Sequence, residues 1–263
     1  MRIATWNIAG GRTYLGHRDP EALSYGYGKE NLSYFTQNLG RVRPDVAVLQ
    51  EVHTPKVTGI SQAESIASTL KLHTTRPIPY DNSHIQPDQH LSLATVSTSP
   101  LEQGQSYTLP HLDLSITRPN GDVWTPFNPT GFHVVEVDHE GQKVQVVNTH
   151  LHPFHYFERD FAEPEFEEYR RAISDFFLSL SGKPTVIAGD FNYANLHTLF
   201  PDVFEKGGYT DAFSRSTTPE KGQQDHILFS RHFQLDNADV QRGSADHYLC
   251  LADVSFKETS ILP

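Results

Sequence analysis

Short apolar runs recur along this chain, and most of them end in a polar residue. Runs such as Val46-Ala47-Val48-Leu49 and Val186-Ile187-Ala188 show no alternation, which indicates strands buried on both faces. The runs at 132–137 and 144–148 are separated by the turn-forming stretch Asp138–Gly141, which predicts a β-hairpin. The predicted strands are Arg2–Ile8, Val46–Leu49, Leu91–Val96, Phe132–Val137, Val144–Asn148, Val186–Ala188, Asp225–Phe229 and Tyr248–Val254.

Longer segments carry their apolar residues at helical spacing. One predicted helix covers Asn31–Val42 and is stopped by Pro44. Ser61 and Glu64 have capping-box spacing, so a second helix is expected to begin there and to run to Leu70. The third is predicted over Glu165–Leu180, where the buried stripe would be Phe166, Tyr169, Ile173, Phe176, Phe177 and Leu180.

Two stretches carry no clear period. Residues 74–89 form a polar, proline-containing connection, and residues 9–29 are rich in glycine and tyrosine, with His17, Arg18, Tyr25 and Tyr27 among them. We expect the second stretch to be a long loop beside the end of the first strand. Loops of this length in compact domains are often functional, and a disordered excursion is the alternative.

The order of hairpins and helices predicts two packed sheets with helices outside them. Repeats, low-complexity tracts and a dividing linker are absent from the sequence. We therefore expect one α/β domain over residues 1–257 and a frayed C-terminal tail over 258–263, working as a monomer. A chain of 263 residues is long enough to bury a sizeable core.

The charge balance bears on the partners. The net charge is −11 at pH 7, whereas a protein that coats a duplex usually carries a basic excess that neutralises phosphates. This balance does not exclude a local basic patch, and the 15 histidines add positive charge at lower pH. A phosphate substrate is more simply held by bound cations in a small site.

The compartment is predicted from weaker signals. The single cysteine, Cys250, lies in an apolar run and fits a small core residue, so no internal disulfide can form. The first strand begins at Arg2, which leaves no room for a signal peptide, and no apolar run is long enough to span a bilayer. We expect a cytoplasmic protein, with an exported one whose signal was trimmed as the alternative.

The stretch Gly189-Asp190-Phe191-Asn192 follows a buried strand and places a carboxylate and a carboxamide two positions apart. On extended backbone such side chains share a face, and together they can hold a water or a phosphate oxygen. The alternative is an ordinary Asx turn, which this tetrapeptide favours when it stands alone. Likewise, Glu51 after its strand is either a solvated rim residue or a ligand.

Comparable residues stand beside several other predicted strands. All of them handle metals, protons or phosphates: Asn7, Glu51, His150, Asp190, Asn192, Asp225, Asp246 and His247. A lone histidine at a strand end is more often structural than catalytic. The whole set in one chain, each member at a strand edge, is a much stronger indication of a site.

These residues stand in motifs that resemble the endonuclease/exonuclease/phosphatase superfamily, also called DNase I-like. The motifs are Thr5-Trp6-Asn7, Leu49-Gln50-Glu51-Val52, Asn148-Thr149-His150-Leu151, Gly189-Asp190-Phe191-Asn192, Asp225-x-Ile227 and Asp246-His247. The resemblance covers almost the whole chain, from Arg2 to about Phe256. The loops between the motifs, which set substrate choice in that superfamily, match nothing familiar.

The resemblance implies a four-layer sandwich of two facing mixed β-sheets flanked by helices, with the site at one edge of both sheets. By this likeness Asn7, Glu51 and Asp246 hold a divalent cation, Mg²⁺ or Mn²⁺. The resemblance also implies that His150 and His247 flank the scissile phosphate and that Asp225 orients His247. It further implies that Asp190 and Asn192 position the attacking water and a phosphate oxygen.

The chemistry of the side chains agrees with these roles. Mg²⁺ prefers oxygen ligands and keeps several waters, and a bound cation stabilises charge that develops on a phosphoryl group. A carboxylate partner raises the pKa of a histidine by stabilising imidazolium. His247 beside Asp225 could therefore take a proton from water or hold the phosphate as a cation. Whether Asp190 or His247 is the general base stays open at this point.

Two positions depart from the superfamily pattern. Ala245 stands where serine is usual before Asp246, and His226 stands where tyrosine is frequent after Asp225. Neither change removes a catalytic group. His53, His152 and His155 lie just after Glu51 and His150; we favour ordinary rim histidines, with phosphate contact or a second metal as the alternative.

The sequence therefore predicts a metal-dependent hydrolase of phosphodiester bonds, in the first place a nuclease acting on DNA or RNA. A phosphomonoesterase or a diesterase of small molecules or lipid headgroups is the alternative, and the acidic balance favours it. A binding protein that has lost catalysis is the third hypothesis, and the complete set of ligands and histidines argues against it.

Overall fold

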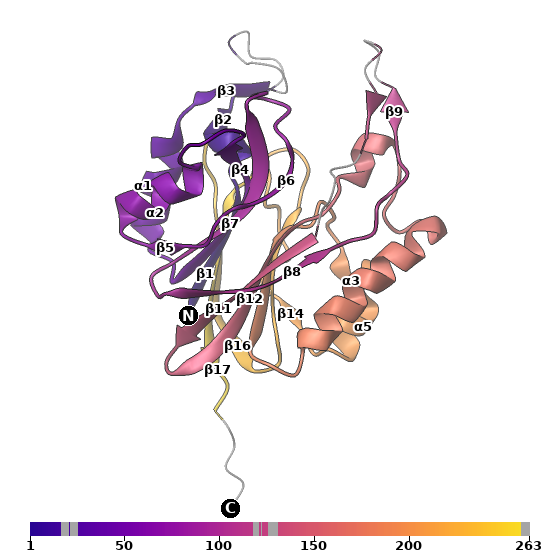
Figure 1. Ribbon diagram of the computed structural model, residues 1–263. Helices are drawn as coiled ribbons and strands as arrows, with labels where there is room; N and C mark the ends of the chain where they lie inside the picture. Colours follow the sequence, from indigo (N-terminus) through magenta and orange to yellow (C-terminus); the bar gives the residue numbers. More distant parts are fainter. Residues whose placement is uncertain (17–20, 22–25, 118–120, 122, 126–130, 259–263) are drawn as a thin grey trace, which may run out of the picture.

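The computed structural model describes residues 1–16, 21, 26–117, 121, 123–125 and 131–258. Two large mixed sheets lie face to face, and helices cover the outer face of each (Figure 1). The first sheet has the strand order β16-β17-β1-β4-β7-β5, with β6 also pairing with β7. Its strands are β1 (Arg2–Asn7), β4 (Val46–Pro55), β5 (His73–Thr74), β6 (Ile78–Asn82), β7 (Gln89–Ser97), β16 (Phe233–Gln241) and β17 (Leu249–Phe256).

The second sheet has the order β14-β15-β13-β12-β11-β8. Its strands are β8 (Leu101–Thr108), β11 (Gly131–His139), β12 (Gln142–His150), β13 (Thr185–Asp190), β14 (Thr210–Asp211) and β15 (Asp225–Phe229). Two small ribbons rise from one edge of the sandwich, namely β2 (Arg12–Tyr14) with β3 (Tyr27–Glu30), and β9 (Ile116–Thr117) with β10 (Val123–Trp124) (Figure 1).

The helices form the two outer layers. The first sheet is covered by α1 (Leu32–Val42) and α2 (Gln62–Leu70), and the second by α3 (Glu167–Leu180) with α5 (Pro201–Glu205) (Figure 1). The remaining helical elements are α4 (Leu196–Leu199) and the 3₁₀ turns η1 (Ala9–Gly11), η3 (Phe154–Phe157) and η4 (Pro164–Phe166). None of the helices that the structure describes is long and apolar enough to cross a membrane.

Apolar residues fill all three interfaces between the layers. Residues such as Val48 and Val186 pack between the two sheets. On the outer faces, Phe35 of α1 packs against Trp6 of the first sheet, and Phe177 of α3 packs against Phe132 of the second. The capping box is formed, since Ser61 accepts from the Glu64 N–H while the Glu64 carboxylate accepts from the Ser61 N–H. The predicted four-layer α/β sandwich is therefore confirmed.

The element boundaries differ from the sequence-based prediction in several places. The strand expected to end at Leu49 continues as β4 to Pro55, and its pairing with β7 shifts register between Leu49 and Val52. The connection at 74–89 contains β6, and the loop at 9–29 contains β2 and β3. Within that loop, His17, Arg18 and Tyr25 lie outside the described residues.

Candidate active site

The first sheet brings Asn7 and Glu51 to one of its edges. Strands β1 and β4 are parallel, and Asn7 at the end of β1 pairs with Gln50, the neighbour of Glu51. At Glu51 the backbone has φ +52°, which a bulky residue rarely adopts, and the break in register with β7 falls here. Such a bulge redirects a side chain, and it explains how Glu51 faces the site although its strand continues.

The second sheet contributes its residues by register alone. In the parallel pair β12–β13, His150 lies beside Asp190, and in the antiparallel pair β13–β15, Asp190 lies beside Asp225. These three side chains therefore start from adjacent backbone positions at one sheet edge. The turn before β17 adds Asp246 and His247, and the backbone carbonyl of His247 accepts a hydrogen bond of 2.9 Å from Trp6 Nε1.

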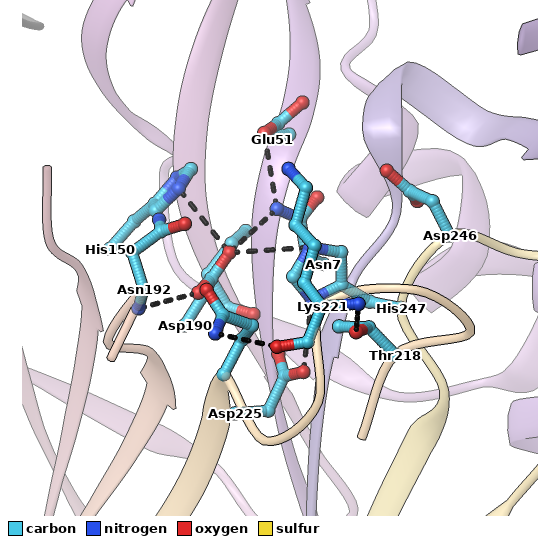
Figure 2. A network of polar contacts seen from close by, with 12 residues as sticks. Asn7, Glu51, His150, Asp190, Asn192, Thr218, Lys221, Asp225, Asp246 and His247 are labelled. Carbon is cyan, nitrogen blue, oxygen red and sulfur yellow. Dashed lines mark hydrogen bonds and ion pairs between the residues drawn. The ribbon is translucent and has the colours of Figure 1, made fainter. Parts of the chain in front are cut away.

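Asn7 connects the two sheets at the centre of the site (Figure 2). Its amide Nδ2 donates to Glu51 Oε1 and to Asp190 Oδ2, each at 3.1 Å, while its Oδ1 accepts from the backbone N–H of Ala9. The amide oxygen keeps its second lone pair for a further partner. Asn7 thus fixes one carboxylate from each sheet and can serve a cation only through that remaining lone pair.

His247 lies between two buried carboxylates. Its Nδ1 is 2.9 Å from Asp225 Oδ2, and its Nε2 is 3.5 Å from Asp190 Oδ2 (Figure 2). Burial alone would lower the pKa of His247, but the charges of Asp225 and Asp190 outweigh it and hold that pKa well above its ordinary value. His247 is therefore an imidazolium at neutral pH in this arrangement.

His150 approaches Asp190 from the other side. Its Nε2 is 3.4 Å from Asp190 Oδ2, and its Nδ1 is 2.8 Å from the hydroxyl of Tyr80, a residue of β6. Although burial would raise the pKa of Asp190, the positive charges of His247 and His150 outweigh it and lower that pKa, so Asp190 is ionised.

Asp190 and Asn192 form the Asx turn that the sequence offered as the alternative. The backbone N–H of Asn192 donates to Asp190 Oδ1 at 2.9 Å, and Asn192 has φ +52°. The Asn192 side chain donates to the carbonyl of Leu151 at 2.9 Å. The turn also places both residues on the cavity, so local turn geometry and a place in the site are compatible here.

Two buried carboxylate oxygens on this cavity have no hydrogen-bond partner among the described residues, namely Glu51 Oε2 and Asp246 Oδ1. Burial raises the pKa of Glu51, and the nearby charge of Asp246 raises it further. Buried acceptors of this kind cost free energy unless they are paired. Hard divalent cations bind such oxygens, so the residues present fit a Mg²⁺ or Mn²⁺ ion.

A second group of potential ligand atoms lies close by. Asp190, Asp225 and His247 each offer one atom, and these atoms lie within 4.8 Å of one another. The ring nitrogens of His247 already face the two carboxylates, so a cation at this position would have to replace the proton that the imidazolium holds. The unpaired oxygens of Glu51 and Asp246 need no such exchange.

The site opens into a cavity of about 370 Å³. Of the eight residues predicted from the sequence, six line this cavity: Glu51, His150, Asp190, Asn192, Asp246 and His247. The other two, Asn7 and Asp225, lie behind them and are connected to them by hydrogen bonds. The structure therefore gathers all eight side chains in one place.

The sequence matches the model of the Endonuclease/Exonuclease/phosphatase family over residues 4–255. The chain belongs to this family. No curated protein matches the sequence.

Solved structures show the same fold at low sequence identity. One is described as an endonuclease/exonuclease/phosphatase from Beutenbergia cavernae, with a TM-score of 0.68 and 18% identity over 97% of this chain and 71% of that one. The human Nocturnin catalytic domain has a TM-score of 0.64 and 16% identity, over 98% of this chain and 93% of that one. A mannosyl-6-phosphatase from Bacteroides thetaiotaomicron has a TM-score of 0.58 and 13% identity, over 97% of this chain and 100% of that one.

The four histidines next to the family motifs lie outside the cavity lining. His53 and His152 are buried, so their interpretation as rim residues is wrong, whereas His155 is exposed as expected. His53 Nε2 lies 2.8 Å from Ser83 Oγ. His226, which replaces the frequent tyrosine of the family, is buried beside Asp211, with Nδ1 2.6 Å from Oδ2. None of the four lines the cavity.

Sequence reasoning missed several residues around the site. Tyr80 contacts His150, and the hydroxyl of Tyr27 donates to Asp246 Oδ2 at 2.7 Å. Trp124 and Lys221 line the cavity. A signal existed for Tyr80, because Ile78, Tyr80 and Asn82 alternate with Pro79 and Asp81 as in a strand. For Tyr27 the signal was its place in the loop expected beside the end of the first strand. For Trp124 and Lys221, only the folded chain brings their segments to the site.

Proposed function

We propose that this protein is a divalent-cation-dependent hydrolase of phosphodiester bonds. The observation that carries the proposal concerns two buried oxygens, one of Glu51 and one of Asp246, which have no hydrogen-bond partner in the described part of the chain. They lie on the same cavity as the ion pair of His247 with Asp190. Potential cation ligands, a proton donor (His247) and a proton acceptor (Asp190) thus face the same cavity. The imidazolium and the carboxylate suit an anionic substrate that is attacked by water.

The chain supplies the cation ligands through Glu51 and Asp246, and through the remaining lone pair of the Asn7 oxygen. When bound, Mg²⁺ or Mn²⁺ would polarise a phosphoryl oxygen and stabilise the charge that develops on it. Tyr27 fixes the second oxygen of Asp246, and Asn7 fixes the second oxygen of Glu51. The two carboxylates are therefore oriented before any cation arrives.

Asp190 is the residue we propose to accept the proton of the attacking water. It is ionised, and it is held by Asn7 on one oxygen and by the Asn192 N–H on the other. His247 already carries a proton, so it is suited to hold a phosphate oxygen by a charged hydrogen bond. This assignment separates the two candidates for the general base that the sequence left open.

His150 and Asn192 are proposed to position the phosphate. Burial raises the pKa of Tyr80 well above its ordinary value, so its hydroxyl stays protonated, and its contact of 2.8 Å with His150 Nδ1 fixes the orientation of the ring. The other ring nitrogen, Nε2, is thereby directed toward Asp190 and the cavity. Asn192 lines the same wall.

A second candidate function is favoured by one observation, the small volume and acidic lining of the cavity. The sequence prediction put nucleases first because many members of this superfamily cleave DNA or RNA. A small cavity lined by several carboxylates is better suited to a small phosphoester than to a polymer with a phosphate at every step. One structural relative is described as a mannosyl-6-phosphatase, which supports keeping small substrates in view.

The test is hydrolysis of bis(4-nitrophenyl) phosphate by the purified protein with Mg²⁺, with Mn²⁺ and with EDTA. We expect cation-dependent release of 4-nitrophenolate, and a loss of about 10²–10⁴-fold in Asp190→Ala, the usual range for removing a general base. The matched control is Glu168→Gln, which changes a carboxylate on the exposed face of α3. Activity that survives both EDTA and Asp190→Ala would contradict the proposal.

A further inference from the structure

Aromatic side chains flank the mouth of the cavity on two sides. Tyr14 and Tyr27 come from the β2–β3 ribbon, with ring centroids 6.1 Å apart. Trp124 of β10 and Tyr156 of η3 form a second pair, at 5.9 Å and an interplanar angle of 78°. All four line the cavity, and the two ribbons stand at opposite sides of the upper edge of the sandwich (Figure 1).

Two hydrogen bonds to backbone carbonyls hold the first pair in place. The N–H of Tyr14 donates to the carbonyl of Ser244 at 2.6 Å, and Arg12 Nη1 donates to the carbonyl of Gly28 at 2.9 Å. The ribbon is thereby fixed to the turn that carries Asp246. Tyr27 in turn donates to Asp246 itself, so this aromatic wall is part of the same unit as the proposed cation ligand.

The charges around the cavity are unbalanced. Its lining contains the carboxylates of Glu51, Asp81, Asp190, Glu220 and Asp246. Lys221 is the one lysine or arginine among these described lining residues, and its Nζ lies 4.2 Å from the centre of the Tyr156 ring and donates to the Tyr156 hydroxyl. A divalent cation and His247 can balance one phosphate on the floor, but flanking phosphates would meet an acidic rim.

The size of the cavity sets a further limit. At about 370 Å³ it falls near the lower end of the range for small-molecule sites, roughly 300–1,000 Å³. Aromatic walls of this kind bind flat rings, because every ring has a π face and stacking does not require a specific hydrogen-bond pattern.

Resting on the proposed function, we infer that the substrate is a small phosphodiester that carries one negative charge and one flat, uncharged ring system. The phosphate binds at Glu51, Asp246 and His247, and the ring binds between the Tyr14–Tyr27 pair and the Trp124–Tyr156 pair. The acidic rim excludes the neighbouring phosphates of a polynucleotide. In the reaction, water adds to phosphorus, the P–O bond to the leaving alcohol breaks, and that alcohol departs with one proton.

The test compares esters that share one leaving group. Dimethyl phosphate (the methyl ester), benzyl methyl phosphate and thymidine 5′-(methyl phosphate) are incubated with Mn²⁺, and kcat/KM for the release of methanol is measured for each. We expect kcat/KM to be at least about fivefold higher for the two ring-bearing esters than for the methyl ester, the lower end of what one stacked ring contributes. Cleavage inside single-stranded oligothymidylate should be slower per bond than cleavage of the thymidine ester.

Variants connect this preference to the walls. In Trp124→Ala and in Tyr156→Ala, the ratio of kcat/KM between the thymidine and methyl esters should fall toward unity, mainly through a higher KM. Tyr107→Ala is the matched control, since Tyr107 is a partly exposed aromatic residue of β8 outside the cavity lining, and its ratio should equal that of the unmodified chain. Thermal melting of each variant reports whether the fold is kept.

The outcomes separate the two levels of the proposal. Cation-dependent hydrolysis of all three esters at equal kcat/KM, or an unchanged ratio in folded Trp124→Ala and Tyr156→Ala, would overturn the ring-binding inference and leave the proposed function standing. Faster internal cleavage of oligothymidylate would also overturn the inference. Failure to hydrolyse any ester with either cation would contradict the proposed function itself.

Discussion

At the scale of single residues, Tyr27 offers a test of the proposed cation ligands. Its hydroxyl donates to Asp246 Oδ2, and the other oxygen of Asp246 has no partner among the described residues. In Tyr27→Phe, Asp246 loses the bond that orients it. We expect Mn²⁺ to bind about tenfold more weakly, in the range reported for loss of such supporting contacts, as measured by calorimetric titration.

Tyr14→Phe is the control for this prediction. It removes a hydroxyl from the neighbouring residue of the same aromatic pair, but that hydroxyl pairs with Glu220 rather than Asp246. Mn²⁺ affinity should be unchanged in Tyr14→Phe. Equal affinity in Tyr27→Phe and the unmodified chain would show that Tyr27 does not support the ligand.

Asp225 gives a second residue-scale prediction, on the charge of His247. In Asp225→Asn the ring loses the carboxylate that contributes most to its high pKa, so that pKa falls toward the ordinary value. A raised pKa keeps the ring protonated until the pH rises through it. The rate should therefore be lower in the variant, and its decline on the alkaline side should begin at lower pH.

The measurement is the pH profile of kcat/KM with Mn²⁺ for Asp225→Asn and for the unmodified chain. Asp211→Asn is a useful comparison because it alters the analogous contact to the buried His226, away from the cavity. An alkaline limb at the same pH in Asp225→Asn and the unmodified chain would contradict the role assigned to the pair.

At the scale of elements, the bulge in β4 destabilises the fold and at the same time places a proposed cation ligand. Glu51 lies there with φ +52° and a buried oxygen that no described residue contacts by a hydrogen bond, and burial raises its pKa. A carboxyl group with a raised pKa loses stabilising free energy as the pH rises, so at neutral pH it destabilises the cation-free protein. Glu51→Gln should raise the free energy of unfolding by about 1 kcal/mol without a cation.

The same variant should lose the stabilisation that Mn²⁺ gives to the unmodified chain, because a ligand that binds only the folded state raises stability with its concentration. Thermal melting with and without Mn²⁺ measures both effects. We expect the order of melting temperatures to reverse on adding Mn²⁺. If Mn²⁺ stabilised both proteins equally, the bulge would not hold a cation.

Hydrophobic pattern predicted the elements whose burial is continuous or strictly periodic. β13, β15 and α1 appeared where apolar runs or helical spacing placed them. β16 was missed because it is an edge strand whose side chains are largely exposed, so its sequence FQLDNADVQ carries no apolar period. β4 was cut short because a strand that continues through a bulge shows polar residues where an end is expected.

At the scale of the whole molecule, the residues on the cavity floor were predictable and the cavity walls were not. The floor comes from strand ends whose neighbours are set by sheet register, and each end is marked in the sequence by a polar residue after an apolar run. The walls come from Tyr27 of β3, Trp124 of β10 and Lys221, which lie in two short ribbons and a loop far apart in sequence. Their meeting depends on tertiary packing, which a local pattern does not encode.

Buried histidines set the response of the whole molecule to acid. Neither ring nitrogen of His133 has a hydrogen-bond partner within the described part of the chain, and burial lowers its pKa from 6.5 to about 4. Burial likewise lowers the pKa of His53 to about 4 and that of His152 to about 3. All three are neutral in the folded protein at pH values where the unfolded chain is protonated.

The sign of the effect follows from proton binding. Between pH 6.5 and about 4 the unfolded state binds more protons at His133 than the folded state does, so the free energy of unfolding falls as the pH falls. A lowered pKa of this size corresponds to roughly 3 kcal/mol for His133. In His133→Leu, which places an apolar group where no polar partner exists, this part of the acid sensitivity should disappear.

Urea unfolding at a series of pH values from 7 down to 4, with the cation removed by EDTA, measures the difference. His133→Leu should gain stability relative to the unmodified chain as the solution is acidified, by roughly 3 kcal/mol over this span. The exposed His73 provides the control, because His73→Leu should keep the slope of the unmodified chain. Parallel curves for His133→Leu and the unmodified chain would mean that His133 is charged inside the fold, and the sandwich would then have to supply a carboxylate or water that its described residues do not show.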